Sequence, residues 1–154
     1  HTLQHDLEIG GEADLTSRVG ALTVIDSSRF VAERVLPNLT VEHRLSSVVL
    51  HPTCSDRHAG DVEHLRTVAA ACADEVVIPF DAGCCAFAGD RGLLHPELTA
   101  SATAREAAEV RGGSYDAYLS SNRTCELGMT RATGHSYRHT IELLEELTRP
   151  VYVR

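Results

Sequence analysis

Short apolar runs alternate with segments of helical periodicity along this chain, and this alternation restricts the fold more than any other feature of the sequence. Each apolar run is only four or five residues long, which is typical of a buried strand and too short for a buried helix. Strands separated by helices predict an α/β fold with a mainly parallel sheet. The four predicted strands cover residues 21–25, 47–50, 75–78 and 116–119.

Capping residues, prolines and glycines divide the intervening segments into helices. The predicted helices cover about residues 26–36, 61–72, 96–112 and 135–147. Cys72 lies on the apolar face of the second of these helices, so we expect it in the core. Cys125 is expected in a loop before the last helix. With right-handed crossovers, these elements give Rossmann-like layers in which helices flank a sheet of about four strands.

Length and charge exclude several classes of protein. A chain of 154 residues is long enough for one core, so we expect an irregular lead-in over residues 1–20 and one domain over residues 21–154. Fourteen basic and 22 acidic residues give a net charge of -8, and no stripe of Lys or Arg is present, so nucleic acid is not an expected partner. No apolar run reaches the roughly 18 residues of a transmembrane helix.

The chain begins at His1 rather than Met, which favours a fragment of a longer protein. It has five cysteines and no secretory signal pattern. Thiols stay reduced inside cells, so the cysteines favour metal binding or thiol chemistry over a framework of disulfides.

Four of the five cysteines follow predicted strands. Cys54, the pair Cys84 and Cys85, and Cys125 each come shortly after an apolar run. The carboxyl ends of parallel strands share one edge of a sheet, so we expect these four thiols to meet there. Four sulfurs suit zinc or an iron–sulfur cluster. The alternative is that each cysteine is a small buried apolar residue, and we keep that interpretation for Cys72.

Four further residues near the cysteines are expected to surround the sulfurs. His51 and His95 can ligate a metal or donate a hydrogen bond to sulfur, although capping and packing are ordinary roles for both. Arg91 and Arg123 can offset thiolate charge or remain solvated at the surface. For His135 and His139, which are four apart and have no third ligand nearby, we expect structural roles.

Four motifs occur in a specific order between about residues 26 and 150. They are HPTCS at 51–55, CCAFAGDRG at 84–92, PEL at 96–98 and SNRTCE at 121–126. This pattern resembles the cysteine-rich CCG domain of heterodisulfide reductase subunits and of glycolate or lactate oxidase iron–sulfur subunits. It resembles more closely the C-terminal end of large FAD-linked dehydrogenases with iron–sulfur domains, which include D-lactate dehydrogenase-like and D-2-hydroxyglutarate dehydrogenase-like proteins.

The resemblance implies an iron–sulfur electron-transfer domain with no catalytic residue of its own. Cys54, Cys84, Cys85 and Cys125 would be the metal ligands, of a 4Fe–4S cluster in the full protein. FAD, bound outside this chain, would oxidise a D-2-hydroxy acid. The implied partners are flavin and ferredoxin-like domains of the same protein and an acceptor such as a quinone or cytochrome. The implied location is the cytoplasm, including the inner face of the membrane as a peripheral protein.

Two positions depart from the family pattern. Ala86 stands where a glycine usually follows the cysteine pair, and Cys125 is followed by Glu126 to Gly128 in place of a second cysteine. The fragment can therefore hold an iron–sulfur cluster, zinc or no metal. Two other functions remain open, namely a non-redox zinc or thiol scaffold and a thiol–disulfide redox domain.

Overall fold

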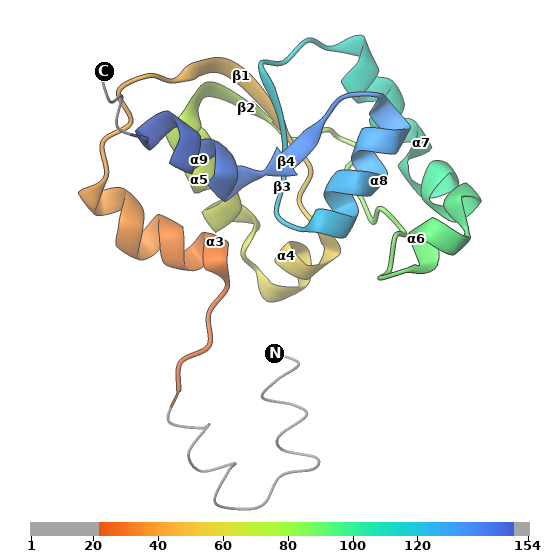
Figure 1. Ribbon diagram of the computed structural model, residues 1–154, viewed down its shortest axis with the longest axis horizontal. Coiled ribbons are helices and arrows are strands. Elements are labelled where there is room, and N and C mark those ends of the chain that lie inside the picture. Colours follow the sequence, from red (N-terminus) through yellow and green to blue (C-terminus); the bar gives the residue numbers. More distant parts are fainter. Residues whose placement is uncertain (1–21, 150–154) are drawn as a thin grey trace, which may run out of the picture.

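The computed structural model describes residues 22–149 and shows an α/β fold with a four-stranded parallel sheet (Figure 1). Every strand pair in the sheet is parallel, so the predicted fold class is confirmed. The predicted lead-in over residues 1–20 lies outside the described residues. In the order β2-β1-β3-β4, the strands are β2 (Ala73–Val77), β1 (Leu45–Leu50), β3 (Ala117–Ser120) and β4 (Tyr137–His139).

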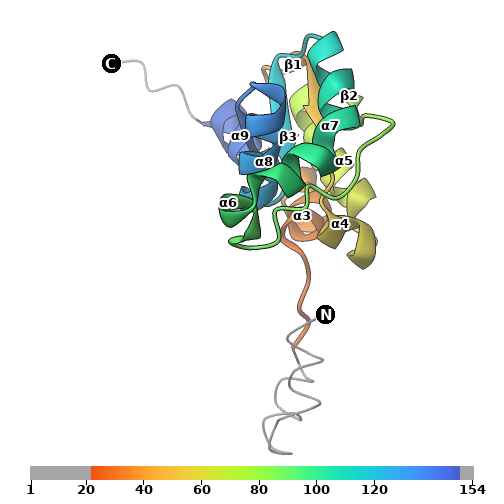
Figure 2. The same ribbon diagram turned by 90° about the vertical axis from the view of Figure 1, so that its right-hand side faces the viewer.

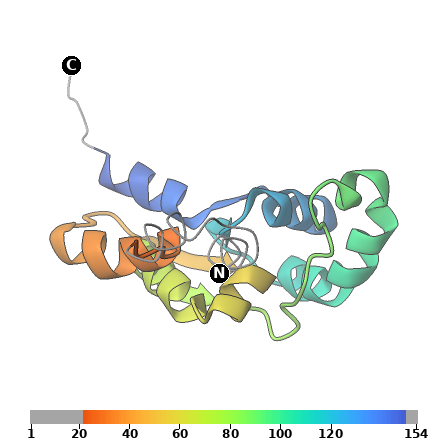
Figure 3. The same cartoon turned by 90° about the horizontal axis from the view of Figure 1, so that it is seen from below.

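Helices cover both faces of the sheet, as Figures 1 and 3 show. The first face carries α3 (Ser27–Phe30), which continues as a π-helix (Val31–Val35) and a 3-10 turn (Leu36–Asn38), together with α5 (Val62–Cys72) and α9 (Thr140–Thr148). The second face carries α7 (Pro96–Gly112) and α8 (Arg123–Thr133). Two short helices, α4 (Cys54–Ala59) and α6 (Arg91–Leu94), lie at the end of the sheet where the strands finish (Figure 2).

The two faces have separate cores because successive side chains of a strand point to opposite faces. Val48 and Leu50 pack with α5 and α9 in a large aliphatic core. Val49, between them, packs with Val110 of α7 and Met129 of α8. Both cores lie against the same strand, which explains why the last three residues of β1, Val48 to Leu50, are all apolar.

The predicted strand at residues 21–25 is wrong. Residues 22–25 form no strand and lead into α3, and Leu22 and Val24 are 60% and 51% exposed. The fourth strand is β4, which pairs with β3 through Tyr118 and Tyr137. An apolar run becomes a strand only where a neighbouring strand offers free backbone N–H and C=O groups. Residues 137–139 lie beside β3 and pair with it, although they are polar or aromatic rather than aliphatic.

The predicted loop around Cys125 is also wrong, because Cys125 lies in the first turn of α8. Asn122 caps this helix by accepting a hydrogen bond from the Thr124 backbone N–H at 3.0 Å. The helix ends at Gly134, whose φ of 79° is the left-handed conformation that glycine adopts without strain. The last helix begins only at Thr140, so His135 and His139 lie before it.

Other local predictions are confirmed. Asp26 caps the first helix by accepting from the Ser28 N–H at 2.7 Å. Cys72 is fully buried on α5. Pro96 begins α7, where its missing N–H leaves no donor unsatisfied. Among residues 22–149, no helix is both long enough and apolar enough to cross a membrane.

The sheet order creates a topological switch point between β1 and β3. From β1 the chain passes over the first face to β2, whereas from β3 it passes over the second face to β4. The loops that leave the carboxyl ends of these two adjacent strands therefore diverge. Such a switch point is where open α/β sheets place their ligands.

Candidate metal and thiol site

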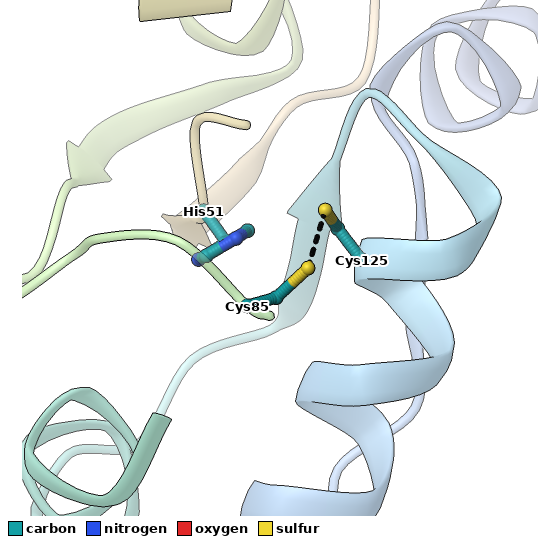
Figure 4. A group of neighbouring side chains, drawn as sticks. All are labelled: His51, Cys85 and Cys125. Atoms are coloured by element: carbon teal, nitrogen blue, oxygen red, sulfur yellow. Dashed lines mark hydrogen bonds between the residues drawn. The ribbon is translucent and has the colours of Figure 1, made fainter. Parts of the chain in front are cut away.

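Three side chains from different elements meet at the switch point (Figure 4). His51 follows β1 directly, Cys85 lies in the loop between β2 and α6, and Cys125 lies in the first turn of α8. One ring nitrogen of His51 and the two Sγ atoms all lie within 4.8 Å of one another, and all three residues are buried. Imidazole nitrogen and thiolate sulfur are ligands of zinc and iron, so this group can hold a metal ion.

The two sulfurs form the closest contact of the site. Cys85 Sγ and Cys125 Sγ lie 2.8 Å apart as a hydrogen-bonded pair, and both thiols are free. Two sulfurs bound tetrahedrally at about 2.3 Å from one zinc ion would be about 3.8 Å apart. The pair would therefore have to open by roughly 1 Å to ligate the same ion.

A buried carboxylate holds the imidazole of His51. Glu106, on α7, lies 2.7 Å from His51 Nδ1, and the two side chains are 3% and 0% exposed. The backbone N–H of Gly83 donates to the other carboxylate oxygen at 3.4 Å. Nδ1 is thus the nitrogen that carries a proton toward Glu106. Nε2 is buried and has no hydrogen-bond partner of ordinary geometry among the described residues.

The main chain around His51 is fixed as firmly as its ring. The His51 N–H donates to the Leu119 carbonyl at 2.8 Å, and Ser120 Oγ donates to the His51 carbonyl at 3.0 Å. These bonds continue the pairing of β1 with β3 beyond the last residue of β1. The imidazole therefore sits on a rigid element rather than on a free loop.

Neighbouring charges set the protonation of the three groups. The hydrogen bond from Cys125 lowers the pKa of Cys85 to about 4, burial opposes this shift, and His51 and the Phe87 N–H reinforce it. The hydrogen bond to Cys85 and burial together raise the pKa of Cys125. Burial alone would lower the pKa of His51, but Cys85 and Glu106 outweigh it and raise the pKa to about 9. At neutral pH the site therefore holds a Cys85 thiolate between a Cys125 thiol and a His51 imidazolium.

The other two predicted ligands lie outside this tight group. Cys54, the first residue of α4, and Cys84 are both exposed. The Ala86 N–H donates to Cys84 Sγ at 3.3 Å. After Cys85 and burial, the charges of Cys54 and Cys84 also raise the pKa of Cys125, which places both thiols in the same neighbourhood. Cys54 also lines a surface pocket of about 840 Å³ between residues 24–29 and 54–61.

Three of the four surrounding residues lie outside the sulfur group. Arg123 lies 2.9 Å from the buried carboxylate of Glu126, as an ion pair within the first turn of α8. His95 lies 3.2 Å from Glu97 at the surface, and Arg91 begins α6. Only His51 of this set belongs to the sulfur group.

His135 and His139 have structural roles, as predicted. The ring of His135 stacks on Tyr118 with centroids 4.2 Å apart. His139 Nε2 lies 2.9 Å from the Ser121 carbonyl, and its Nδ1 accepts from the Ile141 N–H at 3.2 Å. Both nitrogens of His139 are thus occupied by the backbone.

Glu106 was not predicted from the sequence, although a signal for it exists. Thr99, Thr103 and Val110 of α7 are buried, and position 106 shares their face at intervals of three and four residues. A carboxylate on the inner face of a helix has to be paired, so the helical spacing marks it as a partner for a buried donor.

The loop that carries Cys85 has an unusual backbone. Ala86 and Ala88 have φ of 52° and 44°, a conformation that costs a residue with a side chain about 1–2 kcal/mol. Between them Phe87 is 1% exposed and packs against Gly92, where a Cβ atom would lie 2.5 Å from the ring. A glycine at position 86 would adopt this positive φ without the steric cost that Ala86 bears.

Comparisons of the chain with protein-family models, with curated proteins and with solved structures gave no match. The residues of the site therefore carry the functional proposal.

Proposed function

We propose that this chain is the iron–sulfur electron-transfer domain of a flavin-dependent D-2-hydroxy acid dehydrogenase of the D-lactate dehydrogenase-like type. One observation carries most weight. Cys85 and Cys125, which are 40 residues apart in sequence, meet with His51 at the switch point of the sheet. Three of the four ordered sequence motifs each contain one of these residues, and the resemblance that the motifs carry supplies the dehydrogenase part of the proposal.

The residues of the site suit such a centre. Cys54, Cys84, Cys85 and Cys125 supply the four thiols that the resemblance implies, and Cys85 is already a thiolate at neutral pH because its pKa is lowered to about 4. The N–H groups of Ala86 and Phe87 point at the sulfurs of Cys84 and Cys85. Backbone donors of this kind stabilise thiolates and tune a cluster's potential. A bound iron–sulfur cluster would accept and release single electrons.

The surface near the site supports transfer between domains. Cys54 and Cys84 are exposed whereas Cys85 and Cys125 are buried. A centre held by both pairs would have one side at the surface and the other in the protein. We infer that the flavin domain or a ferredoxin-like domain of the parent protein docks at the exposed side, and that a quinone or cytochrome is the final acceptor.

Metal and sulfide analysis of the anaerobically purified chain tests the proposal. We expect iron with acid-labile sulfide, abolished by Cys85→Ala and retained in Cys72→Ala, because Cys72 is buried on the first face of the sheet away from the site. Zinc in stoichiometric amount would contradict the cluster and favour a zinc scaffold. Iron retained in Cys85→Ala would contradict the assigned ligand.

The close sulfur pair also favours one other function, a thiol–disulfide redox domain. The Cys85 thiolate would attack a disulfide substrate, break its S–S bond and release one thiolate. Cys125, after losing its proton, would attack Cys85 Sγ and release the second thiolate, which leaves a Cys85–Cys125 disulfide and a reduced substrate. Cys85 and Cys125 are only 4% and 5% exposed, so this reaction also requires their loop to open. Reduction of a small disulfide by the metal-free chain, lost in Cys85→Ser, would favour this function.

A further inference from the structure

The buried pair His51–Glu106 has the geometry of a metal-ligating histidine and its orienting carboxylate. His51 is fully buried, its Nδ1 lies 2.7 Å from Glu106, and its ring lies beside the two sulfurs (Figure 4). Nε2 is left without a hydrogen-bond partner of ordinary geometry among residues 22–149. A histidine that binds metal through one nitrogen nearly always donates the other N–H to a carboxylate, carbonyl or water.

We propose that His51 is a direct ligand of the metal centre through Nε2, and that Glu106 is the residue that positions it. His51, Cys85 and Cys125 then form the three inner ligands, and one of the exposed cysteines, Cys54 or Cys84, completes a set of four. The proposal changes the ligand set of the proposed function by putting His51 in place of one exposed thiolate, and its iron–sulfur form rests on that function. The centre is thus a mixed nitrogen and sulfur site rather than a site of four thiolates.

The alternative role of His51 is to donate a hydrogen bond from Nε2 to a ligating sulfur. Three features favour ligation. The imidazole is buried as deeply as the sulfurs, its ring orientation is fixed by a buried carboxylate, and its backbone is fixed by two hydrogen bonds to β3. A rigid ligand of this kind requires only that the Cys85 and Cys125 sulfurs separate.

Replacing one thiolate by a neutral imidazole has a chemical consequence. The ligand set carries one negative charge less, so the reduced form of the centre gains stability relative to the oxidised form. Histidine ligation raises the reduction potential of iron–sulfur centres for this reason. Binding also releases the protons of Nε2 and of the ligating thiols, while Nδ1–H stays with Glu106.

Titration of the metal-free chain with Co²⁺ alone tests the proposal without depending on an iron–sulfur cluster. We expect the d–d and sulfur-to-metal bands of a tetrahedral site in the chain as it stands, and ¹⁵N coupling to Co²⁺ in electron–nuclear double resonance after selective ¹⁵N labelling of histidine. His51→Ala should abolish that coupling, and His95→Ala, which removes an exposed histidine, should leave it intact.

The positioning role of Glu106 has its own control on the same helix. Glu106→Gln should weaken Co²⁺ binding by about 10–100-fold and shift the d–d bands, because the imidazole becomes a weaker and less oriented donor. Glu97→Gln, at an exposed position in the first turn of the same helix beside the surface residue His95, should change neither property.

Absence of ¹⁵N coupling in the unsubstituted chain would overturn the proposal whether or not any variant folds. Co²⁺ affinity and bands that survive His51→Ala would overturn it as well. Iron analysis decides the proposed function separately, since a chain that holds Co²⁺ through His51 but never iron and sulfide would retain this inference and lose the cluster.

Discussion

Cys72 and Cys85 are the same residue type at nearly the same burial, 0% and 4% exposed, yet their thiols are opposite in character. Burial among apolar side chains of the first face raises the pKa of Cys72 to about 11. The Cys125 hydrogen bond, with help from His51, lowers the pKa of Cys85 to about 4 despite burial. The neighbours of a buried cysteine, rather than burial itself, therefore decide whether it is a packing residue or a thiolate.

The difference follows from where the two residues lie. Cys72 is at the last turn of α5, where apolar side chains from the sheet and α9 surround it. Cys85 lies at the carboxyl edge of the sheet, where the strands have ended and backbone N–H groups remain to be satisfied. The Phe87 N–H is one such donor, and it reaches Cys85. A strand end supplies hydrogen-bond donors that a helix face does not.

The largest expected difference between Cys72 and Cys85 is the pH at which their thiols ionise. In the metal-free chain, thiolate absorbance in the ultraviolet should show one thiolate near neutral pH, which titrates near pH 4. Cys85→Ser should remove this signal and Cys72→Ala should keep it. A chain that gains thiolate absorbance only as pH approaches 9 would contradict the contrast.

The sign of the pH effect on stability follows from the same shifts. Cys85 has a lower pKa in the folded state than in the unfolded state, so its contribution is complete only above its ordinary pKa of about 9 and is lost progressively as pH falls to about 4. His51 has a raised pKa, so its contribution is complete below its ordinary pKa and is lost as pH rises through about 9. The free energy of urea unfolding should therefore rise from pH 4 to about pH 6.5, and above that pH the two contributions should offset each other.

Breaking the buried ion pair should have the next largest effect. Glu106→Ala leaves the His51 imidazolium buried without its carboxylate, and removing one partner of such a pair costs about 3–5 kcal/mol. Glu97→Ala, at an exposed position in the first turn of α7, should cost less than about 1 kcal/mol. The measurement is the free energy of urea unfolding of the metal-free chains. Equal losses in the two variants would show that Glu106 has no special role.

Replacing Cys72 and Cys85 by serine, one at a time, should distinguish a cysteine that packs in the core from a cysteine that binds metal. Cys72→Ser buries a hydroxyl among apolar side chains and should lower the unfolding free energy by about 1–3 kcal/mol without changing metal content. Cys85→Ser keeps polar partners for the new hydroxyl, so it should cost less stability while it abolishes metal binding. Loss of metal from a Cys72→Ser variant that remains folded would contradict the assignment of Cys72 to packing alone.

The smallest expected effect concerns the strained loop beside Cys85. Ala86→Gly removes the cost of a positive φ and should raise the unfolding free energy by about 0.5–1 kcal/mol, since glycine also loses more entropy on folding. Ala82→Gly is the matched control in the same loop, because Ala82 is not among the residues with positive φ, and it should be neutral or destabilising. Equal changes at the two positions would show that the loop stores no strain at Ala86.

Local patterns predicted most elements and failed where pairing is long-range. Residues 62–72 and 96–112 were predicted as helices because caps and apolar periodicity act within a few residues. Residues 22–25 belong to a run with the composition of a strand but pair with no strand among the described residues, whereas residues 137–139 lack that composition and pair with β3. Strand composition therefore identified candidates, and the fold selected among them.

The sequence by itself determined the α/β class, the core position of Cys72 and the placement of four cysteines after strands, because periodicity, capping and strand ends are properties of neighbouring residues. Only the tertiary structure decided that His51 joins Cys85 and Cys125, and that Glu106, 55 residues away, holds its ring. Those contacts depend on the sheet order and on which face α7 covers. No local pattern encodes them, since a residue's neighbours across a sheet are set by the packing of the whole domain.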